Sequence, residues 1–263
     1  MRVVFAGDWH ASHEAAWAAV KEAKSLGVSW LVHVGDFFYT GHWGHNFLNS
    51  LQRALHRHDM KLVFVRGNHD DTNALRRFEA SANEKGTLSP EGFVPMRERV
   101  FWAPDGLLWE WEGVKFAALG GAPSIDRAHR KVDVSWWADE ETTDYAVDKV
   151  IAGGKVDVLV AHDIPVHVPL RTMYKHDFGM PNRVRLQRAV DGARPDWMFS
   201  GHYHSFQMEQ MTHLDGSHGT SVILDCGDYT GQEFNPARLA RSLFFAEVEN
   251  GRFSQLRQSA FSF

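Results

Sequence analysis

The sequence has a single cysteine, no long apolar run and no excess of positive charge. Cys226 cannot form an intramolecular disulfide, so nothing in the chain requires an oxidising compartment. No stretch of about eighteen apolar residues occurs, and Asp8 follows the first residue too closely for an apolar signal segment. We therefore expect a cytoplasmic protein that has no membrane partner.

The charge balance and the composition set further limits. Lys and Arg number 28 against 33 Asp and Glu, which gives a net charge of −5. This balance disfavours a protein built to coat nucleic acid, although it leaves a nucleotide substrate open. The chain also lacks a linker rich in Pro, Gly and Ser, and 44% of its 263 residues are hydrophobic. We expect one globular domain over residues 1–263.

The first half of the chain alternates short apolar runs with segments of helical period. This pattern predicts parallel strands joined by crossover helices. Strands are expected at 2–6, 30–34 and 62–65, and helices after a cap at Ser12, over 46–57 and over 72–84. A Glu-Gly pair then predicts a hairpin between 108–110 and 114–119 and the start of a second sheet. The expected later elements are an excursion over 124–141, helices over 142–151 and 182–190, and strands at 156–161, 197–199, 221–224 and 242–248.

Unusual polar residues follow five of the predicted strands. The carboxyl ends of parallel strands meet at one edge of a sheet, so we expect these residues to converge on one place. The five clusters are Gly7-Asp8-Trp9-His10, Gly35-Asp36, Gly67-Asn68-His69-Asp70, Ala161-His162-Asp163 and Gly201-His202-Tyr203-His204.

The donors in these clusters are carboxylates, an amide and imidazoles, without a thiolate. Such a set suits Mn, Fe or Zn. Sixteen histidines in the chain agree with metal or proton chemistry. Partners two residues apart, as in Asp8 and His10, project from one face of an extended segment. Any one cluster alone is more typical of a turn or a cap, and His33, between two valines, is interpreted as structural.

The ordered set D-x-H, G-D, G-N-H-D, H and G-H-x-H resembles the signature of the calcineurin-like metallophosphoesterases. Ser135-Trp136-Trp137 and Gly120-Gly121-Ala122 resemble a bacterial and phage-type branch of that superfamily. The resemblance implies an α/β fold, a four-layer αββα sandwich with two mixed β-sheets, whose second sheet the last sixty residues would complete. It also implies a binuclear metal centre and the hydrolysis of phosphate esters.

Carried over to this sequence, the resemblance implies a role for each residue. One metal ion would be held by Asp8, His10 and His204, the other by Asn68, His162 and His202, and Asp36 would bridge the two. The catalytic residues would be Asp36 and His69, with His69 unligated beside the leaving group. Two divalent ions, two aspartates and a bridging hydroxide leave about one positive charge, which attracts phosphate. Manganese is the first metal to test in vitro.

The segment after Asp36 lacks two helpers that the Ser/Thr protein phosphatases of this superfamily carry in G-D-x-x-D-R-G. Here it reads Gly35-Asp36-Phe37-Phe38-Tyr39-Thr40-Gly41, with neither the acidic residue nor the arginine. A monoester dianion gains more from such an arginine than a diester does, so the sequence favours diesters. Arg66 or Arg183 could supply the missing charge, and that preference would then disappear.

Several other residues allow two interpretations. Trp43 either stacks on a base at the substrate mouth or anchors a surface loop. Asp70 and Asp163 either orient metal ligands or have structural roles. Arg183, with Arg185 and Arg188, either meets phosphate or forms a solvated helix face. Trp136 and Trp137 are expected to serve packing.

The motifs and the resemblance leave three classes of function open. The favoured one is a phosphodiesterase acting on small nucleotide-type substrates through a metal-bridging hydroxide. A phosphomonoesterase, a protein phosphatase or a nuclease of the same superfamily is the alternative, although net charge disfavours a nucleic-acid partner. A non-catalytic binding scaffold is the least favoured, because every ligand and His69 are present.

Overall fold

The computed structural model describes residues 1–37, 42–171, 179–227 and 235–256, without the side chains of residues 42 and 43. Within these residues the first sheet has seven strands. Strands β1, β2, β3 and β5 run parallel, while β12, β13 and β4 pair antiparallel. The strands in sheet order are β13 (Arg252–Gln255), β12 (Leu243–Glu249), β1 (Arg2–Ala6), β2 (Trp30–His33), β3 (Lys61–Phe64), β5 (Val100–Trp102) and β4 (Val94–Pro95).

The second sheet, counted over the same described ranges, has six strands. Strands β11, β9, β8 and β7 are parallel, and the edge strands β10 and β6 pair antiparallel with their neighbours. The predicted hairpin is confirmed as β6 and β7. In sheet order the strands are β10 (Gln207–Thr212), β11 (His218–Ile223), β9 (Trp197–Ser200), β8 (Val158–Ala161), β7 (Val114–Leu119) and β6 (Leu108–Trp111).

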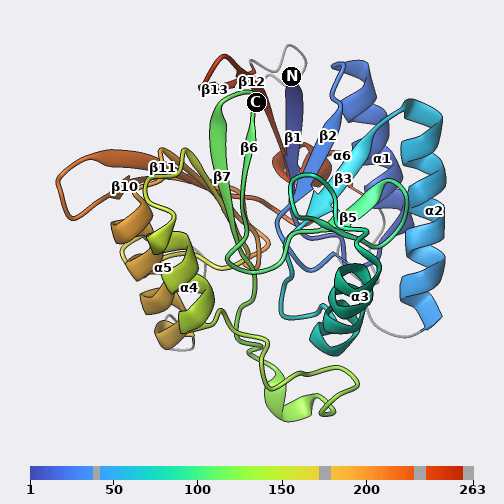
Figure 1. Cartoon of the computed structure of the whole chain (residues 1–263), viewed down its shortest axis with the longest axis horizontal. Coiled ribbons are helices and arrows are strands. Elements are labelled where there is room, and N and C mark those ends of the chain that lie inside the picture. Colours follow the sequence, from blue (N-terminus) through green and yellow to red (C-terminus); the bar gives the residue numbers. More distant parts are fainter. Residues whose placement is uncertain (38–41, 172–178, 228–234, 257–263) are drawn as a thin grey trace.

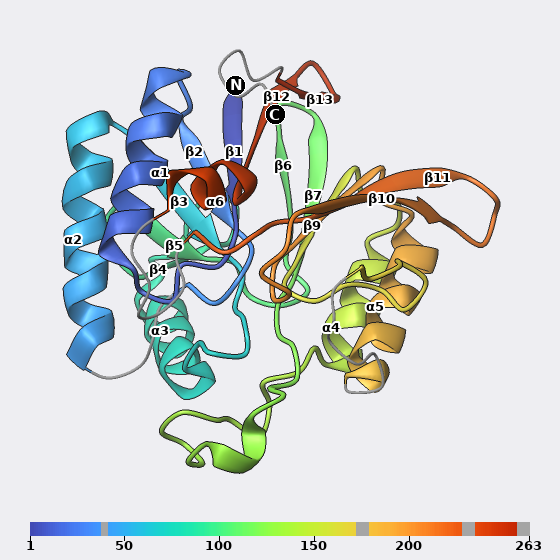
Figure 2. The ribbon, with the colours of Figure 1, turned by 180° about the vertical axis from the view of Figure 1, so that it is seen from behind.

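The helices cover the outer faces of the two sheets, as Figures 1 and 2 show from opposite sides. One apolar layer lies between the two sheets. A second lies between the first sheet and its helices, and a third between the second sheet and its helices. This arrangement confirms the α/β class and the four-layer αββα sandwich. The first sheet is covered by α1 (His13–Ser25), α2 (His42–His58), α3 (Thr72–Lys85) and α6 (Pro236–Arg241), and the second by α4 (Asp144–Ala152) and α5 (Met180–Ala193).

Local sequence accounts for the helix ends. The Ser12 side chain accepts a hydrogen bond from the Ala15 backbone amide at 3.2 Å and so caps α1. Gly27 follows that helix with φ +68°, a conformation that glycine adopts without strain. The helix buries its alanine and valine side chains against the first sheet.

One expectation about topology is wrong. The last sixty residues do not all complete the second sheet: β10 and β11 do, but β12 pairs antiparallel with β1 in the first sheet and β13 follows it. Both faces of β12 are buried, with Phe244 in the layer between the sheets and Phe245 in the layer under the helices. A strand that is apolar on both faces fits the interior of either sheet, so its pattern alone does not select one.

Candidate metal centre

The predicted polar clusters all follow parallel strands at their carboxyl ends. Strands β1, β2 and β3 lead to the clusters at Asp8, Asp36 and Asn68, and β8 and β9 lead to those at His162 and His202. The two sheets face each other across a shared apolar layer, so these strand ends approach one another. Side chains up to almost two hundred residues apart in sequence are thereby brought into contact.

The first group of donors consists of Asp8, His10 and His204. The Nε2 atoms of His10 and His204 lie 3.1 Å apart, and His204 Nε2 lies 3.1 Å from Asp8 Oδ2. One ligand atom from each of the three lies within 4.8 Å of the others. Two imidazole nitrogens and a carboxylate oxygen at such spacing form a suitable set for a borderline divalent cation.

The second group lies beside the first and shares Asp36 with it. Asp36 Oδ2 is 3.4 Å from His162 Nε2 and 3.8 Å from His10 Nε2. Asn68 Oδ1 is 3.2 Å from His162 Nε2, and the rings of His162 and His202 have centroids 5.2 Å apart. All seven side chains proposed as ligands from the sequence therefore gather in one place, with the Asp36 carboxylate between the two groups.

Burial of the carboxylates shows that the site fits a cation. Asp8 and Asp36 are 0% and 2% exposed. Asp8 Oδ1 is buried and has no hydrogen-bond partner among the described residues. A buried carboxylate oxygen without a partner carries a large desolvation cost, which a bound cation would offset. The oxygen and nitrogen donors point to one place, and Asp8 Oδ1 has no hydrogen bond there. This is what a metal site requires.

Three glycines next to the clusters leave the space that the ligands occupy. A Cβ at Gly201 would lie 2.0 Å from Asp8 Oδ1, and one at Gly67 would lie 2.1 Å from Asp36 Oδ1. At Gly35, which has φ +107°, a Cβ would lie 2.3 Å from His162 Nδ1. Real Cβ atoms do not approach other atoms so closely. These three glycines are thus needed for the approach of a proposed ligand from another strand end.

Backbone strain is also concentrated in this site. His10, Asp36, His202 and His204 have φ values of 46°, 52°, 67° and 48°. Non-glycine residues rarely adopt this left-handed conformation, and they retain it where the surrounding structure requires it. In this site the left-handed conformation turns the backbone sharply after each strand, so that the side chain faces the shared cluster.

The carboxylates and the imidazoles shift each other's pKa. Burial raises the pKa of Asp36, but the attraction of His162, His69 and His10 outweighs it and holds the pKa well below its usual value. Burial lowers the pKa of His162, yet the charge and hydrogen bond of Asp36 raise it to about 9. For His204, hydrogen bonds to Asp8 and Cys226 likewise overcome burial and raise the pKa to about 11. The two carboxylates are ionised and attract positive charge.

His69 lies at the edge of the cluster beside an arginine that the sequence argument did not identify. His69 Nε2 is 4.0 Å from Asp36 Oδ2, and its backbone amide donates to Asp36 Oδ1 at 2.8 Å. The Arg130 guanidinium donates to His69 Nε2 at 2.7 Å. Because a guanidinium has only donors, this nitrogen must be the acceptor. Burial, together with the charge of Arg130, lowers the pKa of His69 to about 4, against the opposing attraction of Asp36.

Asp70 and Asp163 both hold loops that carry the site. Asp70 Oδ2 accepts hydrogen bonds from the Gly67 amide at 2.7 Å and the Phe37 amide at 3.3 Å, which joins two of the strand-end turns. Asp163 accepts from Tyr203 Oη at 2.6 Å, so it fixes the residue between His202 and His204. Each aspartate bonds to residues next to the proposed ligands and holds the loops that carry them.

The two arginines named from the sequence are not available to a phosphate. Arg66 donates to Asp105 at 2.7 Å and to the carbonyl oxygens of Glu140 and Glu141. Arg183 donates to the carbonyl oxygens of residues 165, 166 and 168. Both side chains are buried, at 5% and 4% exposure. Both guanidinium groups hold loops together, and in this structure neither one faces the cluster with a free donor pair. Arg185 and Arg188 form ion pairs with acidic residues at or next to α4.

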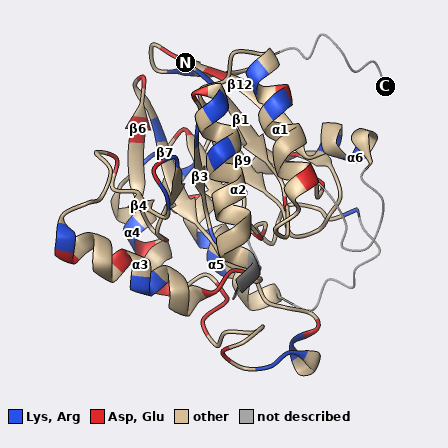
Figure 3. Cartoon of the chain, turned by 90° about the vertical axis from the view of Figure 1, so that its right-hand side faces the viewer, with Lys and Arg blue, Asp and Glu red and all other residues tan. Residues whose placement is uncertain are grey.

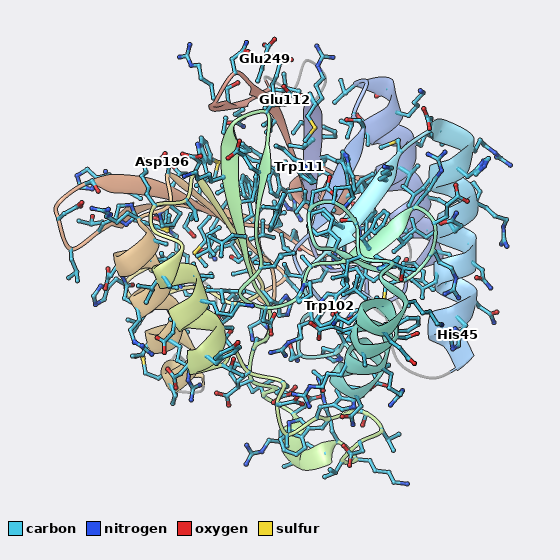
Figure 4. The ribbon with its side chains drawn as sticks, in the orientation of Figure 1. His45, Trp102, Trp111, Glu112, Asp196 and Glu249 are labelled. Carbon is cyan, nitrogen blue, oxygen red and sulfur yellow. The ribbon has the colours of Figure 1, made fainter. Side chains whose placement is uncertain are left out.

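The stretch after Gly41 is helical from residue 42 rather than a loop. The side chain of Trp43 lies outside the described residues, so its proposed stacking on a base stays a prediction. His45 is exposed at the lower end of α2, where Figure 4 shows it at the periphery of the molecule, and its Nδ1 is 3.5 Å from an Arg97 nitrogen.

Trp137 is buried, at 1% exposure, which confirms its role in packing, and Arg127 lies over the Trp136 ring at 5.2 Å from its centroid.

Ser124, Glu140 and Cys226 also join the site and were not predicted. The Asn68 amide donates to Ser124 Oγ at 3.0 Å, and Ser124 in turn donates to Glu140. Cys226 follows β11 at yet another strand end and hydrogen-bonds to His204. The sequence offered one signal for Cys226, which is its position two residues after an apolar run that ends a parallel strand.

Comparison with known proteins agrees with this geometry. The family model of the calcineurin-like phosphoesterases matches residues 1–206. The chain belongs to this family, whose members depend on divalent metals, and it is a hydrolase of phosphoric esters. A search among curated proteins finds no match.

Solved structures of other proteins share the fold. TT1561 of Thermus thermophilus is 13% identical with a TM-score of 0.55, over 86% of this chain and 89% of that one. A dimetal phosphatase from Danio rerio is 12% identical with a TM-score of 0.55, over 96% of this chain and 94% of that one. At these identities the likeness establishes the fold alone, and the bacterial and phage-type branch stays a prediction. Among the described helices, none is both long and apolar enough to cross a membrane.

Proposed function

We propose that this protein hydrolyses phosphate esters with two divalent cations. Asp8, His10 and His204 would hold one cation, Asn68, His162 and His202 would hold the other, and Asp36 would bind both. The observation that carries this proposal is the position of the Asp36 carboxylate, 3.4 Å from His162 Nε2 and 3.8 Å from His10 Nε2. A carboxylate shared by two donor groups is what a binuclear site requires.

The proposed cations and His69 would have different roles in the reaction. Bound divalent cations, with Mn, Fe or Zn suited to these donors, polarise the phosphoryl group and lower the pKa of water. In the net reaction a bond forms between a water oxygen and phosphorus, and the ester P–O bond breaks. The departing alkoxide then needs a proton. His69 lies beside Asp36 at the rim of the cluster. Once it carries a proton on Nε2, which Arg130 then no longer contacts, it would deliver that proton to the alkoxide or stabilise the charge.

Small phosphate esters of the nucleotide type are the substrates that we propose. The preference for diesters rested on the missing arginine, and Arg130 now lies against His69, which removes the reason for that preference. Figure 3 shows Lys and Arg interspersed with Asp and Glu along the chain, and the net charge is −5. This distribution supports a small substrate over a long nucleic acid, which needs an extended basic surface.

Metal stoichiometry and turnover of wild type and Asp36→Asn would test the proposal. The substitution keeps the shape of the side chain but removes the charge that both groups share. We expect about two Mn²⁺ per wild-type chain by elemental analysis, with hydrolysis of aryl phosphate esters. Asp36→Asn should lose both metal ions and most of the turnover.

Asp157→Asn is a matched control. Asp157 accepts a hydrogen bond from the Lys115 amide at 2.7 Å, at the opposite end of the second sheet. The Asp157→Asn variant should keep wild-type metal content and activity. A wild-type protein that binds no metal pair, or an Asp36→Asn variant that retains both ions, would contradict the proposal.

A further inference from the structure

Residues 124–141, which we call the 124–141 excursion, leave the body of the protein between β7 and α4. Figures 1 and 2 show this segment projecting beyond the ends of α3 and α4. It carries the short 3₁₀ turn Arg127–His129 and has no strand pairing beyond one isolated bridge, between Val132 and Trp136, in the described residues. Its charges include Asp126, Arg130 and Lys131.

The root of the excursion is anchored to the metal centre itself. Ser124 at one end and Glu140 at the other hydrogen-bond to each other and are buried, at 1% and 3% exposure. Ser124 Oγ also accepts from Asn68 Nδ2, and Thr72 Oγ1 donates to Asp139 at 2.7 Å. The position of the excursion is thus coupled to that of a proposed metal ligand.

Because the excursion is anchored in this way, the Arg130 side chain lies against His69 at the edge of the cluster. Its NH2 nitrogen lies 2.7 Å from His69 Nε2 and 2.7 Å from Asp126 Oδ1, and NH1 lies 3.4 Å from the Ser135 carbonyl oxygen. The side chain is only 8% exposed. The Asp126 carboxylate, from the same excursion, pairs with Arg130, while at the cluster itself the guanidinium meets the His69 ring nitrogen. A cationic donor therefore lies at the edge of the site.

We propose that Arg130 binds the phosphate of the substrate and makes the site selective for phosphate monoesters. The inference rests on the proposed function and deepens it. A guanidinium offers paired N–H donors that match two phosphate oxygens, and such charge-assisted bonds are among the strongest in proteins. His69 Nε2 lies within 4.0 Å of Asp36, so a phosphate held at the cluster lies within reach of the same guanidinium.

The charge of the substrate determines which ester benefits. A monoester dianion has three terminal oxygens, of which two remain for an arginine fork when one faces the cations. A diester carries one negative charge and has only two such oxygens. The arginine absent from Gly35–Gly41 is therefore replaced by one from the excursion, and transfer of Arg130 to the phosphate also leaves His69 Nε2 free to face the leaving oxygen.

The test compares Arg130→Gln with Lys131→Gln. Lys131 is the next residue, is exposed and carries the same charge. With metal-loaded protein, Arg130→Gln should weaken the binding of inorganic phosphate by about 10–100-fold in calorimetry, the loss expected for a charge-assisted hydrogen bond. It should raise KM for an aryl phosphomonoester by a similar factor and change kcat/KM for an aryl phosphodiester by less than about threefold. Arg130→Lys should recover phosphate binding only in part.

Two results would overturn the inference. Unchanged phosphate binding in Arg130→Gln would exclude a phosphate contact, and equal losses on both esters would make Arg130 a positioning residue for His69. Metal content and thermal unfolding of the variant separate either result from a folding defect. A wild-type protein that hydrolyses neither ester would instead refute the proposed function, whereas the calorimetric comparison would still decide the role of Arg130.

Discussion

Gly201→Ala is predicted to disable the site without unfolding the protein. An alanine Cβ would lie 2.0 Å from Asp8 Oδ1, and Cβ atoms essentially never lie closer than 3.0 Å to another atom. The two atoms must therefore separate by at least 1.0 Å. Ligand distances in metal sites are held to about 0.2 Å. A displacement of 1 Å at a reacting centre can cost about 100-fold in rate.

The carboxylate has little freedom to absorb this shift. Asp8 is fully buried, and its Oδ2 accepts from the His202 amide at 3.0 Å and lies 3.1 Å from His204 Nε2. The oxygen displaced is Oδ1, the one without a hydrogen-bond partner among the described residues. We expect loss of at least one metal ion per chain by elemental analysis. The kcat/KM for an aryl phosphate ester should fall about 100-fold, with an unchanged far-ultraviolet circular dichroism spectrum.

Gly216→Ala controls for the general cost of replacing a glycine. Gly216 lies in the turn between β10 and β11 with φ +81°, and an added Cβ would meet nothing within 4 Å. That variant should lose about 1 kcal/mol of stability through backbone strain and keep its metal and turnover. Wild-type metal content and turnover in Gly201→Ala would refute the reasoning, as would equal losses in both variants.

Two further predictions concern histidines with different roles. His69→Ala should retain its metal ions but lose about 10²–10⁴-fold in kcat; wild-type kcat would remove His69 from the reaction. His33 is fully buried, and burial lowers its pKa from 6.5 to about 3. A group with a lowered folded pKa contributes stability that is complete above pH 6.5 and is lost as the pH falls towards 3. His33→Asn, which keeps an acceptor for the Gly35 amide, should therefore show a loss of unfolding free energy between pH 7 and pH 5 that is about 2 kcal/mol smaller than in wild type. Urea titrations of both proteins in chelator would measure this, and an identical pH dependence would contradict the neutral state of His33.

Much of the metal centre followed from local pattern. Short apolar runs predicted the strands, and parallel strands place their carboxyl ends at one edge, so the polar residues after β1, β2, β3, β8 and β9 could be expected to meet. Their donor types indicated a metal site, and their order resembles a family signature that implies two metal ions. Gly35, Gly67 and Gly201 belong to the same local motifs, and each leaves room for a proposed ligand that another strand provides.

The roles of the arginines could not be obtained in that way. Arg66, Arg130 and Arg183 carry identical side chains, and each follows or lies near a predicted element. Burial and neighbouring carbonyl groups decide that Arg66 and Arg183 hold loops together. Arg130 reaches His69 across 61 positions through an excursion that has no period to interpret. A guanidinium binds whatever acceptor the fold brings to it, and nothing in the local sequence specifies that acceptor.

By itself, therefore, the sequence determined the strand-and-helix pattern of most of the chain, the donor set and its place at the strand ends, because these depend on periodicity and on chemistry within a few residues. The tertiary structure alone decided that β12 joins β1 and that Arg130 faces His69. It also decided that Cys226 borders His204. These contacts join segments far apart in the chain, and their free energy depends on burial and distance, which no local pattern encodes.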